Sequence, residues 1–255
     1  MSEASKKPWA EMKPVFLDTQ NVRNANVAMH ALALQPGKPR IGAFYGHAGV
    51  GKSYWATTYI SRQPEASPYL KCQYVWGGSE LAFLRALCRA FEIESPPHKK
   101  VDCYQLILDG LTARRHLPLF VDDFHRMPRG HLEIMRDLTE LSGAPVVLIG
   151  EEPLEAMLQA HDQVWSRTYQ AMKFRPNEVS DVVLLARNAA GLELAREAAT
   201  HLHQWASGDF RPLDSALAGL LQYAQAQGKG VTISLEDVKV VLKTMLQPRT
   251  RRSVK

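Results

Sequence analysis

The chain has 255 residues, of which 45% are hydrophobic and 22% charged, a composition typical of globular proteins. Its three cysteines form no CxxC pair and no even set, so a disulfide framework or a zinc knuckle is disfavoured and a reducing cytoplasm is expected. No apolar run approaches the roughly 20 residues that cross a bilayer, so no membrane-spanning helix is expected. The net charge of +5 is compatible with a polyanionic partner.

Strands and helices are predicted to alternate as far as residue 176. The predicted helices cover residues 21–34, 52–61, 79–91, 101–115 and 131–142, and the predicted strands cover residues 40–45, 69–76, 117–121, 145–149 and 172–174. The runs at 117–121 and 145–149 are apolar throughout, which is typical of parallel strands that are buried on both faces. The alternation therefore predicts a parallel sheet wrapped by helices.

After residue 176 the pattern becomes entirely helical. The helices predicted there cover residues 178–188, 192–205, 212–225 and 235–246. No strand is expected in this part, and the helical end predicts a small second domain.

The segment after the first predicted strand reads Gly-His-Ala-Gly-Val-Gly-Lys-Ser and fits the phosphate-binding pattern G-x-x-x-x-G-K-S. Glycine lets backbone N–H groups turn inward around phosphate oxygens. Lys52 would place a charge on the terminal phosphates, the Ser53 hydroxyl would coordinate Mg²⁺, and the helix that opens here would add its positive end. We therefore expect ATP with Mg²⁺ to bind here, and a chance glycine turn is the alternative. The expected nucleotide-binding residues are Gly46, His47, Ala48, Gly49, Val50, Gly51, Lys52, Ser53 and Tyr54.

The apolar run at 117–121 ends in two aspartates, Asp122 and Asp123. A nucleotide site of this kind needs a carboxylate at the end of a neighbouring buried strand, so Asp122 is expected to hold Mg²⁺ through water. Asp123 would polarise the attacking water, which makes it a catalytic candidate together with Lys52. The alternative is that both aspartates cap the following helix.

These features resemble those of AAA+ ATPases, and within that class the chain resembles the phage Mu B transposition proteins and the related TnsC-type target selectors. The stretch Asp-Asp-Phe-His-Arg-Met, which starts at Asp122, is similar to the acidic and histidine-containing stretch after the third strand of these proteins. Asp123 stands where a glutamate is expected, and its shorter side chain implies slow hydrolysis or a partner that compresses the site. The resemblance implies an α/β fold, that of an AAA+ P-loop NTPase with a parallel sheet flanked by helices plus a small C-terminal helical lid domain.

The resemblance also implies roles for residues further along the chain. Arg167, which ends the sequence Val-Trp-Ser-Arg, is similar to the catalytic arginine finger that reaches the γ-phosphate of a neighbouring subunit, and the alternative is a surface arginine in a salt bridge. Arg211, which ends the turn Gly-Asp-Phe-Arg, resembles the sensor-two arginine that contacts the nucleotide of its own subunit. The alternative for Arg211 is a turn arginine without a ligand. Glu151 is the nearest candidate for sensor one.

On this interpretation the chain has four parts. They are an N-terminal extension over residues 1–20, an AAA+ α/β nucleotide-binding domain over 21–176, a helical lid domain over 177–247 and a basic C-terminal tail over 248–255. The tail is either a solvated terminus or a docking segment for DNA or a transposase.

A role in DNA transposition and recombination follows from the resemblance. Such a protein is a Mg²⁺-dependent ATP hydrolase that forms a ring or helical filament on duplex DNA, presents target DNA and recruits or activates a transposase. It would act in a bacterial cytoplasm or, if phage-encoded, in that of the host. Binding to DNA should be sequence-tolerant and salt-dependent. Candidate DNA contacts are Lys99, Lys100, Arg126 and Arg129, each of which can equally be an ordinary solvated charge.

The same sequence features are compatible with other functions. Another AAA+ role on nucleic acid, of the helicase or clamp-loader type, shares every motif above. A nucleotide-regulated interaction protein of the secretion-ATPase type resembles the chain in its Gly-x-x-Arg lid turn and would need no DNA. A small-molecule kinase is disfavoured, because it would gain nothing from Arg167 facing another subunit.

Overall fold

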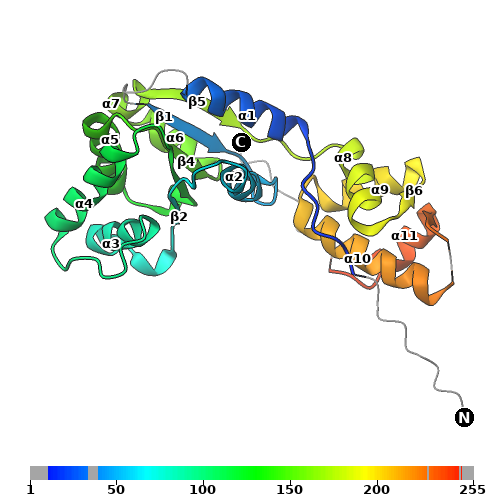
Figure 1. Cartoon of the computed structure of the whole chain (residues 1–255). Coiled ribbons are helices and arrows are strands. Elements are labelled where there is room, and N and C mark those ends of the chain that lie inside the picture. Colours follow the sequence, from blue (N-terminus) through cyan, green and yellow to red (C-terminus); the bar gives the residue numbers. More distant parts are fainter. Residues whose placement is uncertain (1–10, 34–39, 229, 247, 249–255) are drawn as a thin grey trace, which may run out of the picture. The chain divides into compact units, whose positions relative to one another are not determined.

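The computed structural model describes residues 11–33, 40–228, 230–246 and 248, and these residues form two compact units. The sheet unit covers Gln20–Arg175, and the helical unit combines the described residues before position 20 with those after position 175 (Figure 1). Residues 249–255 of the predicted basic tail lie outside the described residues. Among the described residues, no helix is both long and apolar enough to cross a membrane.

The sheet unit is built on parallel strands, as the alternation of strands and helices predicts. Within the described residues the strands are β1 (Ile41–Tyr45), β2 (Tyr69–Lys71), β3 (Leu119–Asp122), β4 (Val146–Gly150) and β5 (Thr168–Lys173), in the spatial order β2-β3-β4-β1-β5. Val146 of β4 pairs with Ile41 on one side and with Leu119 on the other. The expectation that the acidic strand neighbours the strand before the glycine loop is therefore wrong, because β4 separates β3 from β1.

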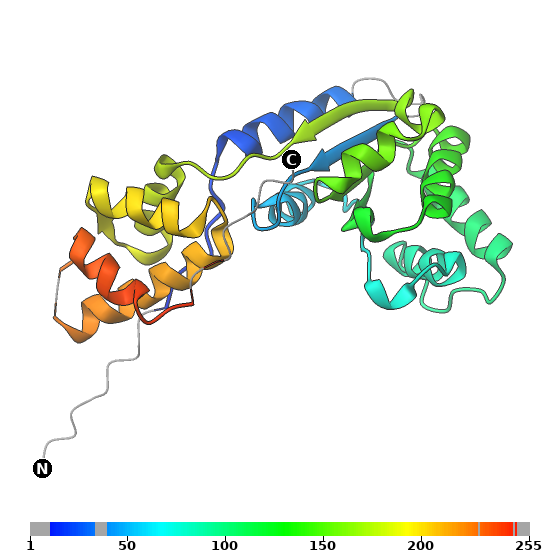
Figure 2. The same cartoon turned by 180° about the vertical axis from the view of Figure 1, so that it is seen from behind.

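Helices cover both faces of this sheet. In the sheet unit they are α1 (Gln20–Ala33), α2 (Lys52–Ser61), α3 (Glu80–Ala90), α4 (Lys100–Ala113), α5 (Arg129–Ser142), α6 (Pro153–Gln159) and α7 (Asp162–Trp165) (Figures 1 and 2). Successive strand residues point to opposite faces, so Leu119 and Val121 meet α3, α4 and α5, whereas Phe120 meets α2. Both faces are apolar, which is why the predicted strands are continuous apolar runs.

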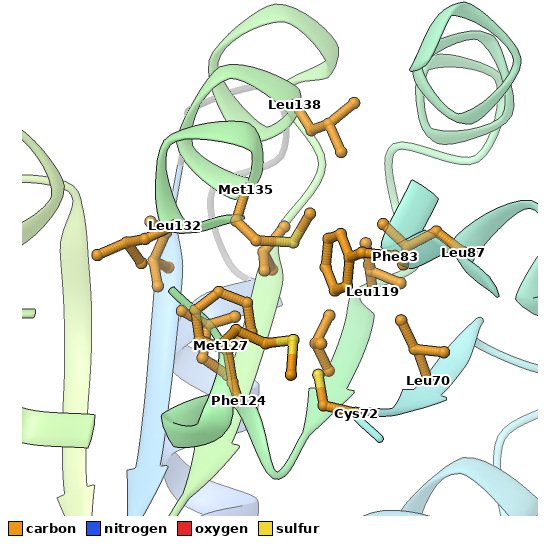
Figure 3. Close-up of a cluster of buried hydrophobic side chains, with 14 of the residues drawn as sticks. Leu70, Cys72, Phe83, Leu87, Leu119, Phe124, Met127, Leu132, Met135 and Leu138 are labelled. Carbon is orange, nitrogen blue, oxygen red and sulfur yellow. The ribbon is translucent and has the colours of Figure 1, made fainter. Parts of the chain in front are cut away.

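The face toward α3, α4 and α5 holds a large apolar core (Figure 3). Leu70 of β2 and Leu119 of β3 lie in one cluster with Phe83 and Leu87 of α3 and with Met135 of α5. A buried side chain of this kind contributes about 1.5–3 kcal/mol to folding. The same cluster holds the cysteines as buried free thiols, as expected for a protein without a disulfide framework: Cys72, Cys88 and Cys103.

The opposite face is packed with aromatic rings around Trp55 of α2. The ring centroid of Trp55 lies 4.7 Å from that of Phe44, 5.8 Å from that of Phe174 and 6.4 Å from that of Phe120. The indole Nε1 donates to Asn26 Oδ1 of α1 at 3.0 Å, so the polar atom of the ring has a partner. Trp55 thereby fastens α2, the helix that follows the glycine loop, to the sheet and to α1.

Two predicted strands differ from the observed ones. β2 ends at Lys71, because its last pair is Lys71 with Asp122, where β3 also ends. Residues Tyr74–Trp76, expected to continue the strand, form a 3₁₀ turn instead. β5 begins at Thr168, earlier than predicted, because it pairs with β1 along its length. Its residues alternate between half-buried and exposed, so it lacks a continuous apolar run.

The helical unit contains the C-terminal helices that the sequence predicts. They are α8 (Val179–Leu185), continued by a π-helical turn, α9 (Arg196–Ala206), α10 (Phe210–Ala226) and α11 (Leu235–Leu242). The expectation of no strand in this part is wrong, since β6 (Glu193–Leu194) and β7 (Thr232–Ile233) pair in parallel. Strands of two residues are too short to leave an alternating pattern in the sequence.

The segment just before α1 packs with the helical unit. Leu17 is buried in the apolar core of that unit, and the Lys13 N–H donates to the carbonyl oxygen of Ala189 at 2.8 Å. Residues 11–19, which the sequence assigns to a separate extension, therefore share a core with the C-terminal helices.

Candidate nucleotide-binding site

The predicted phosphate-binding loop runs from the end of β1 to the start of α2. Gly46 has a φ of +145°, and a Cβ atom at this position would lie 2.4 Å from the carbonyl oxygen of Phe174. Gly51 directly precedes α2 and has a φ of +92°, in the region that favours glycine. The backbone of the loop therefore requires glycine at both of these positions, as a cradle for phosphate oxygens does.

Lys52 turns its side chain back into the loop. Its Nζ donates to the carbonyl oxygens of Gly46 at 2.8 Å and His47 at 2.6 Å, and the residue is 8% exposed. An ammonium group held in the curl of the loop is well placed to meet phosphate oxygens. Ser53 follows in the first turn of α2 and is partly exposed, so its hydroxyl can ligate a cation, and Tyr54 is half exposed.

Asp122 is buried at the end of β3, and both of its carboxylate oxygens are engaged. Oδ2 accepts from the Tyr69 hydroxyl at 2.7 Å, and Oδ1 accepts from the N–H of Asp123 at 2.8 Å. Burial, followed by the nearby Asp122 carboxylate, raises the pKa of Tyr69, so the phenol stays protonated and donates. A carboxylate of fixed orientation suits a Mg²⁺ site. The glycine cradle, Lys52, Ser53 and Asp122 together fit a nucleotide with Mg²⁺.

Asp123 adopts a left-handed backbone conformation with a φ of +55°, which costs a non-glycine residue about 1–3 kcal/mol. Its carboxylate lies 3.7 Å from Lys71 Nζ and 3.7 Å from Arg126 Nη2. The side chain makes no capping hydrogen bond to the described turn at Phe124–Arg126, so the capping alternative does not hold for Asp123. Sequence reasoning missed Tyr69 and Lys71, because no local motif marks them and only the pairing of β2 with β3 brings them here.

The end of β4 is tied to its surroundings through two histidines. His125 Nδ1 accepts the N–H of Glu151 at 3.1 Å, and burial lowers the pKa of His125, which favours the neutral ring that this bond needs. The Glu152 carboxylate lies 2.7 Å from Lys173 Nζ and 3.4 Å from His47 Nε2, so it connects the phosphate loop to β5. The sensor-one role of Glu151 stays a prediction.

The two arginines with predicted roles lie in different units, Arg167 in the sheet unit and Arg211 in the helical unit. Arg167, between α7 and β5, forms an ion pair with Glu140 of α5, and its Nη1 donates to the carbonyl oxygen of Gln163 at 2.5 Å. This ion pair agrees with the alternative interpretation of Arg167 as a surface arginine in a salt bridge. The arginine-finger role requires a second subunit and stays a prediction. Arg211 lies in the first turn of α10, where its N–H donates to Asp209 Oδ1 at 2.9 Å. Its sensor-two role also stays a prediction.

The predicted DNA-contacting residues are all exposed, but their surroundings differ. Lys100 Nζ lies 2.7 Å from Glu80, so its charge is neutralised locally. Arg126 contacts the Asp123 carboxylate, Lys99 directly precedes α4, and Arg129 is the first residue of α5. Their contacts with DNA stay predictions.

These features define the class of protein. A parallel β2-β3-β4-β1-β5 sheet flanked by helices, with a phosphate loop after β1 and carboxylates at the end of β3, matches the fold of AAA+ P-loop NTPases. Residues 36–158 match the sequence model of the family described as "AAA domain". Residues 36–158, just under half of the chain, are therefore similar to an AAA domain, as the sequence predicts.

Solved structures show which particular proteins have a similar fold. The ORC2 protein of Aeropyrum pernix, in ADPNP–ADP complexes, has a TM-score of 0.66 at 14% identity, over 93% of this chain and 70% of that chain. ORC1 of the same organism, in complex with DNA, has a TM-score of 0.59 at 17% identity, over 88% and 64% of the two chains. Domain III of the Thermotoga maritima replication initiation protein DnaA has a TM-score of 0.56 at 18% identity, over 91% and 95%. Identities this low show a common fold alone, and comparison with curated proteins by sequence finds no match.

Proposed function

We propose that this protein is an ATP-dependent, DNA-binding AAA+ ATPase that acts in DNA transposition. The observation that carries the ATPase part is the glycine loop with Lys52 held in its curl, together with Asp122 fixed at the end of β3. The carboxyl ends of parallel strands meet at one edge of a sheet, which favours a common site for these groups. The transposition part is supported by the resemblance to the phage Mu B and TnsC-type proteins.

In this proposal the phosphates of ATP lie in the loop, and Ser53 and Asp122 hold the Mg²⁺ ion. The ion would neutralise charge on the reacting phosphates. Lys52 would exchange its contacts with the loop carbonyls for the terminal phosphates. Asp123 would orient the attacking water with its carboxylate. Because aspartate is shorter than the glutamate of the resembling family, slow hydrolysis without a partner is expected.

Oligomerisation would complete the site. Arg167 would leave Glu140 and present its planar guanidinium to the γ-phosphate of a neighbouring subunit. Arg211 would contact the nucleotide of its own subunit and couple the helical unit to the nucleotide state. A head-to-tail contact of this kind closes into a ring or continues as a helical filament.

Duplex DNA and a transposase are the proposed partners. The ORC1 protein of similar fold was solved in complex with DNA, and the net charge of +5 suits a polyanion. Contacts from lysine and arginine to phosphates would make DNA binding sequence-tolerant and salt-dependent. The oligomer on DNA would then present the target to the transposase.

A second candidate is another AAA+ role on nucleic acid, of the helicase or clamp-loader type. The similarity in fold to ORC and DnaA proteins favours an AAA+ ATPase that acts on nucleic acid, without distinguishing transposition from these other roles. Binding to a transposase, measured with purified partners, separates the two candidates. A nucleotide-regulated interaction protein that ignores DNA is the remaining alternative.

Electron microscopy of the protein with duplex DNA, with and without ATP and Mg²⁺, tests the proposal. Rings or filaments that need both ATP and DNA are expected. Lys52→Ala and Arg167→Ala should abolish them, while Arg114→Ala, a change of an exposed arginine at the end of α4, should not. A protein that binds ATP yet stays dispersed and ignores DNA would refute the DNA-coating role and favour the nucleotide-regulated interaction protein.

A further inference from the structure

Arg126 has two neighbours of different kinds. Its Nη2 lies 3.7 Å from the Asp123 carboxylate, and the same side chain lines a hollow on the surface of the sheet unit. Lys71 contacts the same carboxylate at 3.7 Å. The side chains of Arg126 and Lys71 are 43% and 57% exposed, so a ligand in solution can reach either cation while it contacts Asp123.

The hollow has a volume of about 680 Å³ and is lined by Tyr74, Val75, Gly77, Arg126 and Pro128. Tyr74 is 87% exposed and Val75 81% exposed. They stand on the 3₁₀ turn after β2, which is closed by a hydrogen bond of 3.0 Å from the Gly77 N–H to the Tyr74 carbonyl oxygen. Two adjacent large apolar side chains, displayed on an ordered turn beside a hollow, indicate a contact surface.

The charges around the hollow favour a polyanion as its occupant. Arg126 lines the hollow, and Arg129 directly follows the lining residue Pro128. Lys71 contacts the same Asp123 carboxylate as Arg126 does. All three cations are exposed, whereas the Asp123 side chain is only 18% exposed. Glu80, a nearby carboxylate at the start of α3, is already paired with a lysine at 2.7 Å. Tyrosine hydroxyls and arginine guanidinium groups both donate to phosphate oxygens of nucleic acids.

We propose that this hollow binds the backbone of duplex DNA and that Arg126 couples the binding to ATP hydrolysis. A phosphodiester oxygen in the hollow competes with Asp123 for the guanidinium of Arg126. Asp123 then keeps Lys71 and is freer to hydrogen-bond the attacking water, so DNA accelerates hydrolysis. Arg126 acts here as a positioning residue. The inference rests on the proposed function, to which it adds a DNA surface and a means of regulation.

Binding of a fluorescent duplex in the presence of a non-hydrolysable ATP analogue tests the surface. Tyr74→Ala and Arg126→Ala are expected to bind more weakly than the wild type. Arg126→Ala should also reduce the slope of log affinity against log salt concentration by about 1, as expected for one lost phosphate contact. Tyr169→Ala is the matched control, because Tyr169 is a half-exposed tyrosine on β5, at the opposite edge of the sheet from β2. It should bind as the wild type does.

Rates of ATP hydrolysis test the coupling. The wild-type rate is expected to rise when duplex DNA is added. Arg126→Ala should hydrolyse ATP faster than the wild type without DNA and gain little from DNA, while Arg126→Lys should keep part of the stimulation. Tyr74→Ala should need more DNA for stimulation, whereas Tyr169→Ala, outside the hollow, should keep the wild-type rates with and without DNA. An Arg126→Ala variant with wild-type rates in both conditions, and a wild-type melting temperature, would overturn the coupling.

The failure of this inference can be told apart from the failure of the proposed function. If the wild type binds DNA and assembles on it, and both hollow variants bind equally well, the surface assignment is wrong while the proposed function stands. If the wild type neither binds DNA nor assembles on it, both are wrong.

Discussion

Asp122 shows how much the site depends on single contacts. Its Oδ2 accepts from Tyr69 at 2.7 Å, and a hydrogen bond to a carboxylate is worth about 1.5–3 kcal/mol. Tyr69→Phe keeps the ring but removes this donor, so only the N–H of Asp123 still orients the proposed Mg²⁺ ligand. We expect ATP binding to require about tenfold more Mg²⁺, since 1.4 kcal/mol corresponds to a factor of ten. A Mg²⁺ titration with a fluorescent ATP analogue measures this.

The matched control for Tyr69→Phe is nucleotide binding in EDTA. Without Mg²⁺ the variant and the wild type should bind equally, because the phosphate loop is unchanged. A Mg²⁺ midpoint identical to that of the wild type would show that the Tyr69 hydroxyl has no part in the metal site.

Two partly or fully buried histidines predict how stability changes with pH. Burial lowers the pKa values of His125 and His131 below the ordinary value of 6.5. His125 accepts from the N–H of Glu151. The ring of His131 packs edge-on against that of Phe83, with 4.8 Å between the ring centroids. As pH falls below 6.5 the unfolded chain takes up these protons before the folded chain does. The free energy of unfolding should therefore fall as pH decreases from 6.5 through the lowered pKa values.

Melting temperatures at about pH 7.5 and about pH 5.5 measure this effect. His125→Gln is expected to lose less stability between the two values than the wild type. His98→Gln, in which an exposed histidine is changed, should lose as much as the wild type does. Equal losses in all three proteins would mean that His125 does not titrate as inferred.

At the scale of the elements, α2 joins the phosphate loop to the core. Trp55 is 1% exposed and contacts rings of β1, β3 and the residue after β5. Trp55→Ala should reduce the free energy of unfolding by about 3–5 kcal/mol, because a large buried ring is replaced by a cavity. Urea denaturation measures it. Tyr54→Ala, next on the same helix and half exposed, should change stability by no more than about 0.5 kcal/mol. A small effect at Trp55 would mean that α2 is held by other contacts.

At the scale of the whole molecule, Arg167 pairs with Glu140 of its own chain, whereas the proposed finger role places it at the nucleotide site of a neighbouring subunit. If Arg167 acts on a neighbouring site, Lys52→Ala and Arg167→Ala should each be inactive alone and regain ATPase activity when mixed. The mixture contains interfaces that join an intact Lys52 to an intact Arg167. The control mixture is Lys52→Ala with Asp123→Ala, which should stay inactive because both residues belong to one site. A first mixture without activity would contradict a role of Arg167 at a neighbouring subunit's site.

Local features of the chain were sufficient to predict the class of fold and the phosphate loop. The loop is one contiguous motif, and its backbone conformation requires glycine locally, because Gly46 and Gly51 have positive φ values. The buried strands β3 and β4 are continuous apolar runs because both of their faces are covered. The N-cap of α3 is likewise a local feature, since Ser79 accepts from the Ala82 N–H at 3.2 Å, within one turn.

What the sequence by itself determined is therefore the identity of the main-sheet strands and of the long helices, because helix period, apolar runs and glycine loops depend on neighbouring residues. Only the tertiary structure decided the strand order, which placed β4 between β1 and β3, and the short pair β6 and β7. It also decided the partners of the site carboxylates: Tyr69 lies 53 positions from Asp122, and Lys71 reaches Asp123 from another strand. Contacts between distant residues follow from sheet register, and register is set by the packing of the whole sheet rather than by any local pattern.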